Sequence, residues 1–411
     1  MNYLKAIIFI STNKSGSSRE AIKAAEKLGY YTILFTNNEK QLEQRKEYIE
    51  VHKMISVNTN SLEEMREEIS KLLLKSIDIK TIVSFIDPFV HIASILCDEF
   101  CQNYNSSNAI KIMEDKEETR KFLADKPYTP KFISIHPDDI ISTKSLIKEI
   151  NLPIIVKSPK STGSKDVLLA RSKAQLGKNI QTLRSKYPEE TIMLEEYIEG
   201  EQCLVEAIIY KKRANIVGII EQEITKGKRF IITGYGVIID VPDNFKKELE
   251  DVLHSIVTAF DIENGALHLE IRLSESGWKL IEINPRISGG AMNKMIEAAY
   301  GFSLVEETIK LFVGEQPNLT PRHKKHVFTK YIISSKKGIL EKVTGKGRAS
   351  KSPGVVDLYV KPKKGTLIMP PLSMGHRYAY IIATGSSLAE AKMNANTAAS
   401  EIEFHIQGYE N

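Results

Sequence analysis

The sequence contains few cysteines, and their arrangement excludes several kinds of site. Only three occur in 411 residues: Cys97 and Cys101 lie one helical turn apart, and Cys203 stands alone. No Cys-x-x-Cys pair or other zinc-ligand spacing is present, and three separated thiols do not form a disulfide framework. We therefore expect reduced, partly buried thiols in a cytoplasmic protein.

Long apolar runs and a strong charge of one sign are also missing. No apolar stretch approaches the ~20 residues that a membrane-spanning helix needs, and the first residues lack the layout of a secretory signal. The net charge is +5 at pH 7, and the lysines and arginines are spread along the chain. Such a charge suits a small anionic ligand, so we expect neither a membrane nor a nucleic acid as partner.

Hydrophobic patterning divides the chain into three parts. Over 1–110, apolar strand segments alternate with amphipathic helices, which is typical of a Rossmann-like parallel sheet with helical crossovers. Over 111–316, strand and hairpin signals dominate, and 113–126 is expected to form one charged helix. Over 317–411, Gly- and Pro-punctuated strands precede a final helix. We predict an N-terminal α/β domain, a central α+β domain and a small C-terminal α+β lobe.

The turn after the first strand, residues 13–16 (NKSG), resembles a phosphate loop only superficially. It matches neither G-x-G-x-x-G nor G-x-x-x-x-G-K-[ST]. We interpret it as a strand-to-helix turn that faces a substrate at the carboxyl end of the sheet.

The stretch LIEINPRISGG, residues 280–290, places polar side chains inside an apolar strand. Side chains alternate along a strand, so Glu282 and Asn284 share one face. If a three-residue loop ending at Gly277 closes the hairpin, then Glu270 lies opposite Glu282, and His268 lies opposite Asn284. Facing carboxylates repel each other, and with an amide oxygen they suit Mg²⁺ bound to nucleotide phosphates. A solvent-facing hairpin would explain Glu270 alone, but not the whole set.

The residues after this strand suit an anion. Pro285 ends the strand, and Arg286 follows it, where a planar cation can hold a carboxylate or a developing phosphoryl charge. Gly289 and Gly290 allow close backbone approach, and their amides can face a negative charge. We interpret these three residues, Arg286, Gly289 and Gly290, as candidate catalytic groups.

GALHLEIRL (265–273) and GWKLIEINPRISGG (277–290) resemble the metal-binding segment of the ATP-grasp superfamily. The resemblance covers about 110–315 and implies an ATP-grasp fold, in which two α+β subdomains grip ATP, with a lid at about 125–195. It implies that Glu270 and Glu282 hold two Mg²⁺ ions, for which Mn²⁺ can substitute, and that Asn284 binds the second ion.

The same resemblance implies an ATP site built from separate elements. The first lysine lies in EDKEETRKFL, the second in LPIIVKSPKSTGSKDV before a flexible loop, and MLEEYIEG resembles the hinge that reads adenine. Within this hinge, Glu195 would lie near the exocyclic amine, and Glu196 to Ile198 would give backbone contacts. The family usually has a glutamate for the ribose where this chain has Gln202, and Glu201 is the alternative. The implied ATP residues are Lys116, Lys157, Ser161, Thr162, Gly163, Ser164, Glu195, Glu196, Tyr197, Ile198 and Gln202.

The substrate pocket is expected between the central domain and its neighbours. Candidate linings are 84–88, 232–236 and 374–377 together with Arg286. Asp87 could receive an amino or guanidinium group, or could instead cap the next turn. His268 is either a substrate contact or part of a buried polar layer. The candidate substrate residues are therefore His268, Asp87 and Gly234.

The resemblance implies an activity. ATP-grasp enzymes typically phosphorylate a carboxylate with ATP and let an amine displace phosphate from the acyl phosphate. The layout is most similar to bacterial L-amino-acid ligases, which form dipeptides and release ADP and phosphate. The alternatives are a ligase that loads an amino acid onto a carrier protein, a ligase for another small-metabolite carboxylate, and an ATP-binding protein without catalysis. A homodimer is compatible with the family, and the sequence does not reveal which amino acids are joined.

Overall fold

The computed structural model describes residues 4–101, 106–158, 166–225 and 231–408. The chain begins with a parallel four-stranded sheet in the order β3-β2-β1-β4. Its strands are β1 (Leu4–Ile10), β2 (Tyr31–Thr36), β3 (Lys53–Ser56) and β4 (Ile77–Val83). Both faces of β1 are buried, as its continuous apolar sequence predicts.

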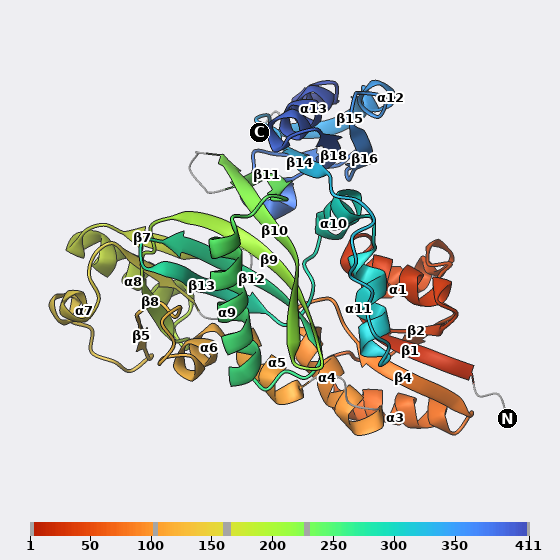
Figure 1. Cartoon of the computed structure of the whole chain (residues 1–411), viewed down its shortest axis with the longest axis horizontal. Coiled ribbons are helices and arrows are strands. Elements are labelled where there is room, and N and C mark those ends of the chain that lie inside the picture. The colour runs from red at the N-terminus through yellow and green to blue at the C-terminus, as the bar shows by residue number, and fades with distance from the viewer. Residues whose placement is uncertain (1–3, 102–105, 159–165, 226–230, 409–411) are drawn as a thin grey trace.

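Helices cover both faces of this sheet. Ile7 and Phe9 pack against α1 (Ser17–Lys27) and α11 (Leu304–Phe312). Ile8 and Ile10 face the opposite way, toward α3 (Leu62–Leu73) and α4 (Phe89–Phe100). The predicted Rossmann-like domain is therefore confirmed, and α11 joins it to the centre of the molecule (Figure 1).

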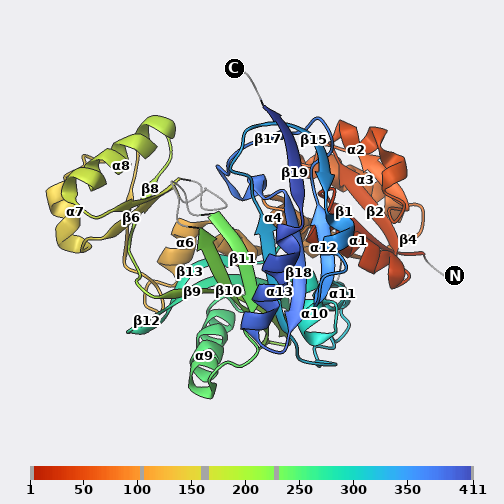
Figure 2. The same ribbon diagram turned by 90° about the horizontal axis from the view of Figure 1, so that it is seen from above.

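A second, antiparallel sheet forms a separate projection at the left of Figure 2. It has the order β5-β8-β6-β7 and carries α7 (Thr143–Glu149) and α8 (Lys173–Lys186). Its strands are β5 (Phe132–Ile135), β6 (Ile154–Lys157), β7 (Val167–Ala170) and β8 (Ile192–Glu196). This projection occupies the part of the chain in which the lid was predicted.

The largest sheet has eight strands in the order β13-β12-β9-β10-β11-β14-β18-β16. They are β9 (Glu201–Tyr210), β10 (Arg213–Thr225), β11 (Ile231–Val237), β12 (Gly265–Ser274), β13 (Gly277–Asn284), β14 (His326–Ile332), β16 (Val355–Val360) and β18 (Ala379–Gly385). Strands from both sides of residue 317 share this sheet, so the C-terminal lobe continues the central sheet.

Helix packing separates the two faces of the large sheet. Leu267, Leu269 and Ile271 of β12 face α9 (Asp243–Ala259) and form a core with it. His268 and Glu270 consequently face the other side, where α10 (Met292–Tyr300) packs farther along the sheet. The predicted alternation of the hairpin thus sets which side can become a polar site.

The C-terminal lobe completes the fold. Helix α13 (Leu388–Ser400) packs across β14 and β18, beside short α12 (Lys346–Ala349). A three-stranded sheet, β17-β15-β19, adds β15 (Gly338–Thr344), β17 (Leu367–Ile368) and β19 (Glu403–Gly408). Among the helices described, none combines the length and apolar character needed to cross a membrane.

The prediction of one charged helix over 113–126 is wrong. Helix α5 (Ser107–Glu114) ends, Asp115 is extended, and α6 (Lys116–Phe122) begins. The Asp115 carboxylate accepts hydrogen bonds from the backbone N–H groups of Glu117 and Glu118, which is the interaction of an N-cap residue. The break matters because it places Lys116 in the first turn of a new helix beside β13.

Candidate active site

The hairpin β12–β13 brings the candidate metal ligands together. Glu270 pairs with Glu282, and His268 pairs with Asn284, so both predicted pairs are confirmed. The predicted turn is wrong, because Ser274 pairs with Gly277 and the loop holds two residues. A β-bulge after Glu270 compensates by leaving one extra residue, Ile281, on β13. The shorter turn and the bulge cancel, which restores the register at the carboxylates.

The bulge is held by groups from α6 and the chain after it. The Ile281 carbonyl accepts a hydrogen bond of 2.6 Å from Arg120 Nη2. Next to it, the Leu280 N–H donates to the Tyr128 carbonyl at 2.8 Å. Arg120 is only 1% exposed. The irregularity beside Glu282 is therefore an ordered feature of the site.

The facing carboxylates of Glu270 and Glu282 repel each other, and this repulsion changes the pKa of Glu270. Burial and the neighbouring Glu282 charge both raise the pKa of Glu270. Lys116 Nζ lies 3.4 Å from Glu282 Oε1, and Gln202 Nε2 donates to Glu270 Oε2 at 3.2 Å. The Gln202 oxygen accepts from Arg272, so the side chain predicted for the ribose braces a carboxylate in this structure.

These residues fit a divalent cation that arrives with other oxygen ligands. Two half-buried carboxylates and the Asn284 amide are hard donors of the kind that Mg²⁺ takes. In the described ranges, no three Asp, Glu, His or Cys side chains gather as a complete metal site. A cation at Glu270 and Glu282 would therefore need oxygens from water or from a bound phosphate.

The second candidate ATP lysine lies in a buried ionic triad. Lys157 Nζ is 2.6 Å from Glu195 Oε2, and Arg120 Nε is 2.8 Å from Glu195 Oε1. All three side chains are at most 6% exposed. Burial lowers the pKa of Lys157; burial alone would raise that of Glu195, but Arg120 and Lys157 turn its net shift downward.

This triad changes the picture of the ATP site. The Glu195 carboxylate, which the resemblance placed near the adenine amine, is occupied by two cations here. Arg120 was missed by the sequence analysis, because on a charged helix nothing distinguishes it from its neighbours. The candidate loop residues Ser161, Thr162, Gly163 and Ser164 lie outside the described residues.

The hinge after β8 already uses most of its backbone groups. The N–H groups of Glu196 and Tyr197 donate to the carbonyls of Lys131 and Pro153 at 3.0 and 3.1 Å. The Ile198 carbonyl accepts from Arg272 at 2.7 Å. Of the N–H groups of Glu196, Tyr197 and Ile198, the one of Ile198 has no acceptor among the described residues and remains for a ligand.

Arg286 and Asp87 form an ion pair between domains. Asp87 follows β4, and its two oxygens accept from Arg286 Nε, at 2.9 Å, and from Nη2. The guanidinium that the sequence suggested for Asp87 is therefore the protein's own. Glu114 lies nearby, and burial together with the Asp87 charge raises its pKa to about 7.

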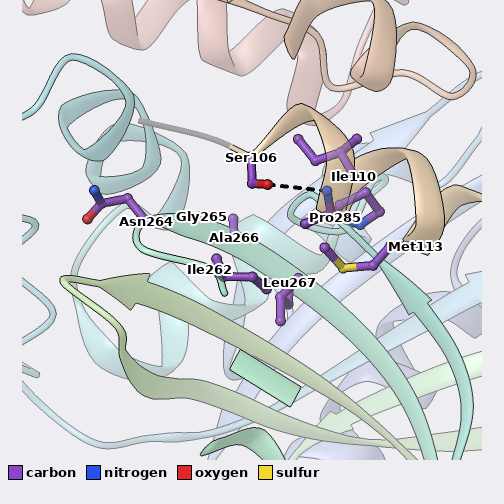
Figure 3. A pocket seen from close by; sticks show the side chains of 10 residues that line it. Ser106, Ile110, Met113, Ile262, Asn264, Gly265, Ala266, Leu267 and Pro285 are labelled. Carbon is purple, nitrogen blue, oxygen red and sulfur yellow. Dashed lines mark hydrogen bonds between the residues drawn. The ribbon is translucent and has the colours of Figure 1, made fainter. Parts of the chain in front are cut away.

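Two small hollows flank Pro285, the residue that precedes Arg286 in the sequence. In Figure 3, Ile110 and Met113 of α5 and its N-cap residue Ser106 lie across from Ile262 and Leu267, with Pro285 beside them. The second hollow reaches Ser84 and Arg286 from the side of β4. The first hollow is lined partly by Ala266 and Leu267 of β12, and neither hollow is lined by Glu270 or Glu282.

The loop that carries Gly289 and Gly290 is braced on both sides. The Ser288 N–H donates to Glu206 Oε2 at 3.2 Å. The Ser288 carbonyl accepts from the Ser17 hydroxyl and, at 3.1 Å, from Asn293 Nδ2. Sequence analysis missed all three partners; Glu206, a lone charge within the apolar segment CLVEAIIY, offered the one available signal.

The N-terminal domain approaches the same loop. Gly16 has φ +88°, and a β-carbon there would lie 3.5 Å from the backbone nitrogen of Gly290. The turn at 13–16 therefore lies against the candidate catalytic loop, and its facing a substrate stays a prediction. Ser17 begins α1, so one short segment both starts a helix and supports the loop.

His268 belongs to this polar layer. Its Nδ1 lies 2.6 Å from Glu206 Oε1, and Glu206 is completely buried. Burial alone would lower the pKa of His268, but the Glu206 carboxylate outweighs that effect and the pKa lies above its ordinary value. In this structure the Nδ1 of the His268 ring is engaged by Glu206, and a contact of His268 with a substrate stays a prediction.

Gly234 has a packing role in the structure. A β-carbon at Gly234 would overlap the Phe328 ring. The next side chain, Tyr235, points to the opposite face and meets Tyr331 edge-on, with ring centroids 5.8 Å apart. Within the segment 232–236, Tyr235 therefore lies on the Glu270 side of the sheet, in the cluster against which Ile232 also packs.

Comparisons with known proteins agree with this geometry. A family model described as an ATP-grasp domain matches residues 150–294, and one described as L-amino acid ligase C-terminal domain 2 matches residues 330–407. The chain thus contains an ATP-grasp domain, followed by a segment similar to a C-terminal domain of L-amino acid ligases. The predicted ATP-grasp fold and the nucleotide-binding class are thereby confirmed.

Individual proteins and solved structures are also similar to this chain. An uncharacterized protein of Sinorhizobium fredii, y4rH, is 26% identical over 98% of this chain and 84% of its own length. An L-arginine-specific L-amino acid ligase of Bacillus subtilis is 27% identical over 32% of each chain. The crystal structure of an L-amino acid ligase from Bacillus licheniformis has a TM-score of 0.81 and 16% identity. That match covers 99% of this chain and 100% of the other, and it shows the shared fold.

Proposed function

We propose that this ATP-grasp ligase joins two L-amino acids into a dipeptide and releases ADP and phosphate. The observation that carries the proposal is the facing pair Glu270–Glu282, with Lys116 beside it and the Arg286–Gly290 segment directly after its strand. The similarity of residues 330–407 to the C-terminal domain of L-amino acid ligases supports amino acids as substrates.

The first step would transfer the γ-phosphoryl group. A carboxylate oxygen of the donor amino acid attacks the γ-phosphorus, the bond to the ADP oxygen breaks, and an acyl phosphate forms. Lys116 and Lys157 would balance the phosphate charge, and Ser161–Ser164 would cover it. Glu270, Glu282 and Asn284 would hold Mg²⁺, or Mn²⁺ in its place, which when bound would neutralise phosphate oxygens.

The second step would form the amide. The amine of the acceptor attacks the acyl carbon, the carbon–oxygen bond to phosphate breaks, and the amine loses a proton. The amides of Gly289 and Gly290 would stabilise the developing oxyanion, with Arg286 beside them. The Asp87 pair would orient Arg286, and the Ser288 contacts would keep the loop from relaxing.

The test is phosphate release with Mg-ATP over pairwise mixtures of the twenty L-amino acids, followed by mass spectrometry of the positives. Glu282→Ala is expected to abolish release, whereas Glu275→Ala, an exposed change in the turn of the same hairpin, is expected to leave it intact. A dipeptide mass that is lost only in Glu282→Ala supports the proposal.

Silence across the panel with ATP still bound would overturn the free-amino-acid proposal. It would favour a carrier-bound acceptor, another small carboxylate, or ATP binding without catalysis. Action in the cytoplasm and homodimer formation stay predictions alongside it.

A further inference from the structure

An arginine of the C-terminal lobe lies against the tyrosines that border the catalytic loop. Arg377 follows the short helix η2 (Met374–His376), and its guanidinium carbon is 3.9 Å from the centroid of the Tyr331 ring. Its Nη1 lies 3.5 Å from the Tyr235 hydroxyl oxygen. Its Nε donates to the Met374 carbonyl at 3.2 Å. Three protein groups therefore orient a half-buried cation.

The two tyrosines connect Arg377 to the reacting end of the site. A β-carbon at Gly290 would lie 3.6 Å from the Tyr331 hydroxyl. Tyr235 is 8% exposed, and burial raises its pKa to about 12, with further contributions from Tyr331 and from the charge of Glu270. Tyr235 thus lies within electrostatic reach of the carboxylate pair, and Tyr331 borders the candidate oxyanion loop.

Arg377 differs from the other cations of the site in its partners. Arg286 is paired with Asp87, Lys157 with Glu195, and Lys116 lies against Glu282. Within the described ranges, no Asp or Glu oxygen lies within 4.0 Å of the Arg377 side chain. A stacked guanidinium whose fork lacks an acid partner is suited to a planar carboxylate from a ligand.

We infer that Arg377 binds the free α-carboxylate of the acceptor amino acid. The inference rests on the proposed function and names the acceptor as an α-amino acid whose carboxylate is not activated. The donor's carboxylate must react beside Glu270, Glu282 and Arg286, so it is not available to Arg377. An acceptor held by its carboxylate at Arg377 would extend its amine toward Gly290, where the acyl carbon must lie.

The test compares an acceptor amino acid with its carboxamide, which keeps the amine and loses the negative charge. The full chain is assayed with ATP, a fixed donor and each acceptor from the productive pair. In the wild type, the KM for the amide is expected to be at least about tenfold higher than for the acid. In Arg377→Gln, the KM for the acid rises to that of the amide, so the ratio falls to about one.

Two further variants separate recognition from folding. Arg377→Lys keeps a charge without the planar fork and is expected to recover part of the preference for the acid. Lys361→Gln removes an exposed charge that contacts the Gly375 carbonyl of the same segment, and is expected to preserve the wild-type ratio. A ratio in Arg377→Gln equal to that of the wild type would overturn the inference.

Hydroxylamine distinguishes this failure from failure of the proposed function. It attacks an acyl phosphate at carbon, displaces phosphate and gives a hydroxamate, so it reports donor activation without any acceptor site. Hydroxamate formation together with equal wild-type KM values for acid and amide would overturn the role of Arg377 alone. Absence of hydroxamate with every donor would overturn the proposed function, and the inference with it.

Discussion

The two halves of the candidate site handle charge in opposite ways. On the hairpin, Glu270 faces Glu282, and burial makes their repulsion stronger. Where the projecting sheet β5–β8 meets α6, Arg120, Glu195 and Lys157 alternate in sign and satisfy one another in a buried triad. The triad therefore joins the projecting sheet to the hairpin through Arg120, whereas the charges of the facing pair do not neutralise each other.

The largest effect on stability is expected in the triad of Arg120, Glu195 and Lys157, whose charges balance one another. Arg120→Met removes the shared partner of the Glu195 carboxylate and of the Ile281 carbonyl. We expect the free energy of unfolding to fall by about 3–5 kcal/mol, because a buried carboxylate loses one of its two cations. Urea denaturation measures it. Lys121→Met, half-exposed on the next position of α6, is the control, and an equal loss in both variants would refute the triad's role.

A smaller effect should come from coupling within the triad. Lys157→Met and Glu195→Gln each disturb a buried pair, but the double variant removes both charges together. We expect a coupling free energy of about 1–3 kcal/mol in a double-mutant cycle. If the losses in unfolding free energy measured by urea denaturation are additive, the two residues act independently. The triad would then not differ from the hairpin pair in the way described above.

In the facing pair Glu270–Glu282, removing a charge should raise the free energy of unfolding, in contrast to the triad. Because the pKa of Glu270 is raised in the folded state, the folded protein binds this proton more tightly than the unfolded chain. That stabilisation is full at low pH and is lost as the pH rises through the raised value. Glu270→Gln cannot ionise and avoids this loss. Without Mg-ATP at pH 8, the free energy of unfolding of the variant should therefore exceed that of the wild type by about 1 kcal/mol.

The same variant should lose this advantage in two conditions. At pH 4, Glu270 is protonated and the two proteins should melt alike. With Mg-ATP, the wild type should gain more, since a cation relieves the Glu270–Glu282 repulsion. Thermal denaturation at both pH values tests this, and a Glu270→Gln variant that is less stable than the wild type at pH 8 would contradict the account.

The smallest effect is expected from Glu201, which neighbours Gln202 but lies outside the network of contacts around Glu270. Glu201 is exposed, whereas Gln202 contacts both Glu270 and Arg272. Glu201→Gln should change the unfolding free energy by less than about 0.5 kcal/mol and leave the KM for ATP unaltered. A several-fold rise in that KM would instead make Glu201 the ribose ligand.

Much of the fold could be predicted because strand periodicity and helix patterning are local. The alternating apolar residues of 267–271 set which face of β12 is polar, and the structure confirms it. The helix break at Asp115 was missed because a charged run masks a capping residue. The pairing at Glu270 was right although the predicted turn was wrong, since a bulge offset the error.

The sequence by itself determined the parallel N-terminal sheet and the polar face of the hairpin that carries both carboxylates, because side-chain alternation operates over a few residues. Only the tertiary structure decided the partners of the charges: Asp87 with Arg286, Glu195 with Lys157 and Arg120, and Glu206 with His268 and Ser288. Those contacts join segments far apart in the chain. Which charges meet depends on how the domains pack, and no local pattern encodes that packing.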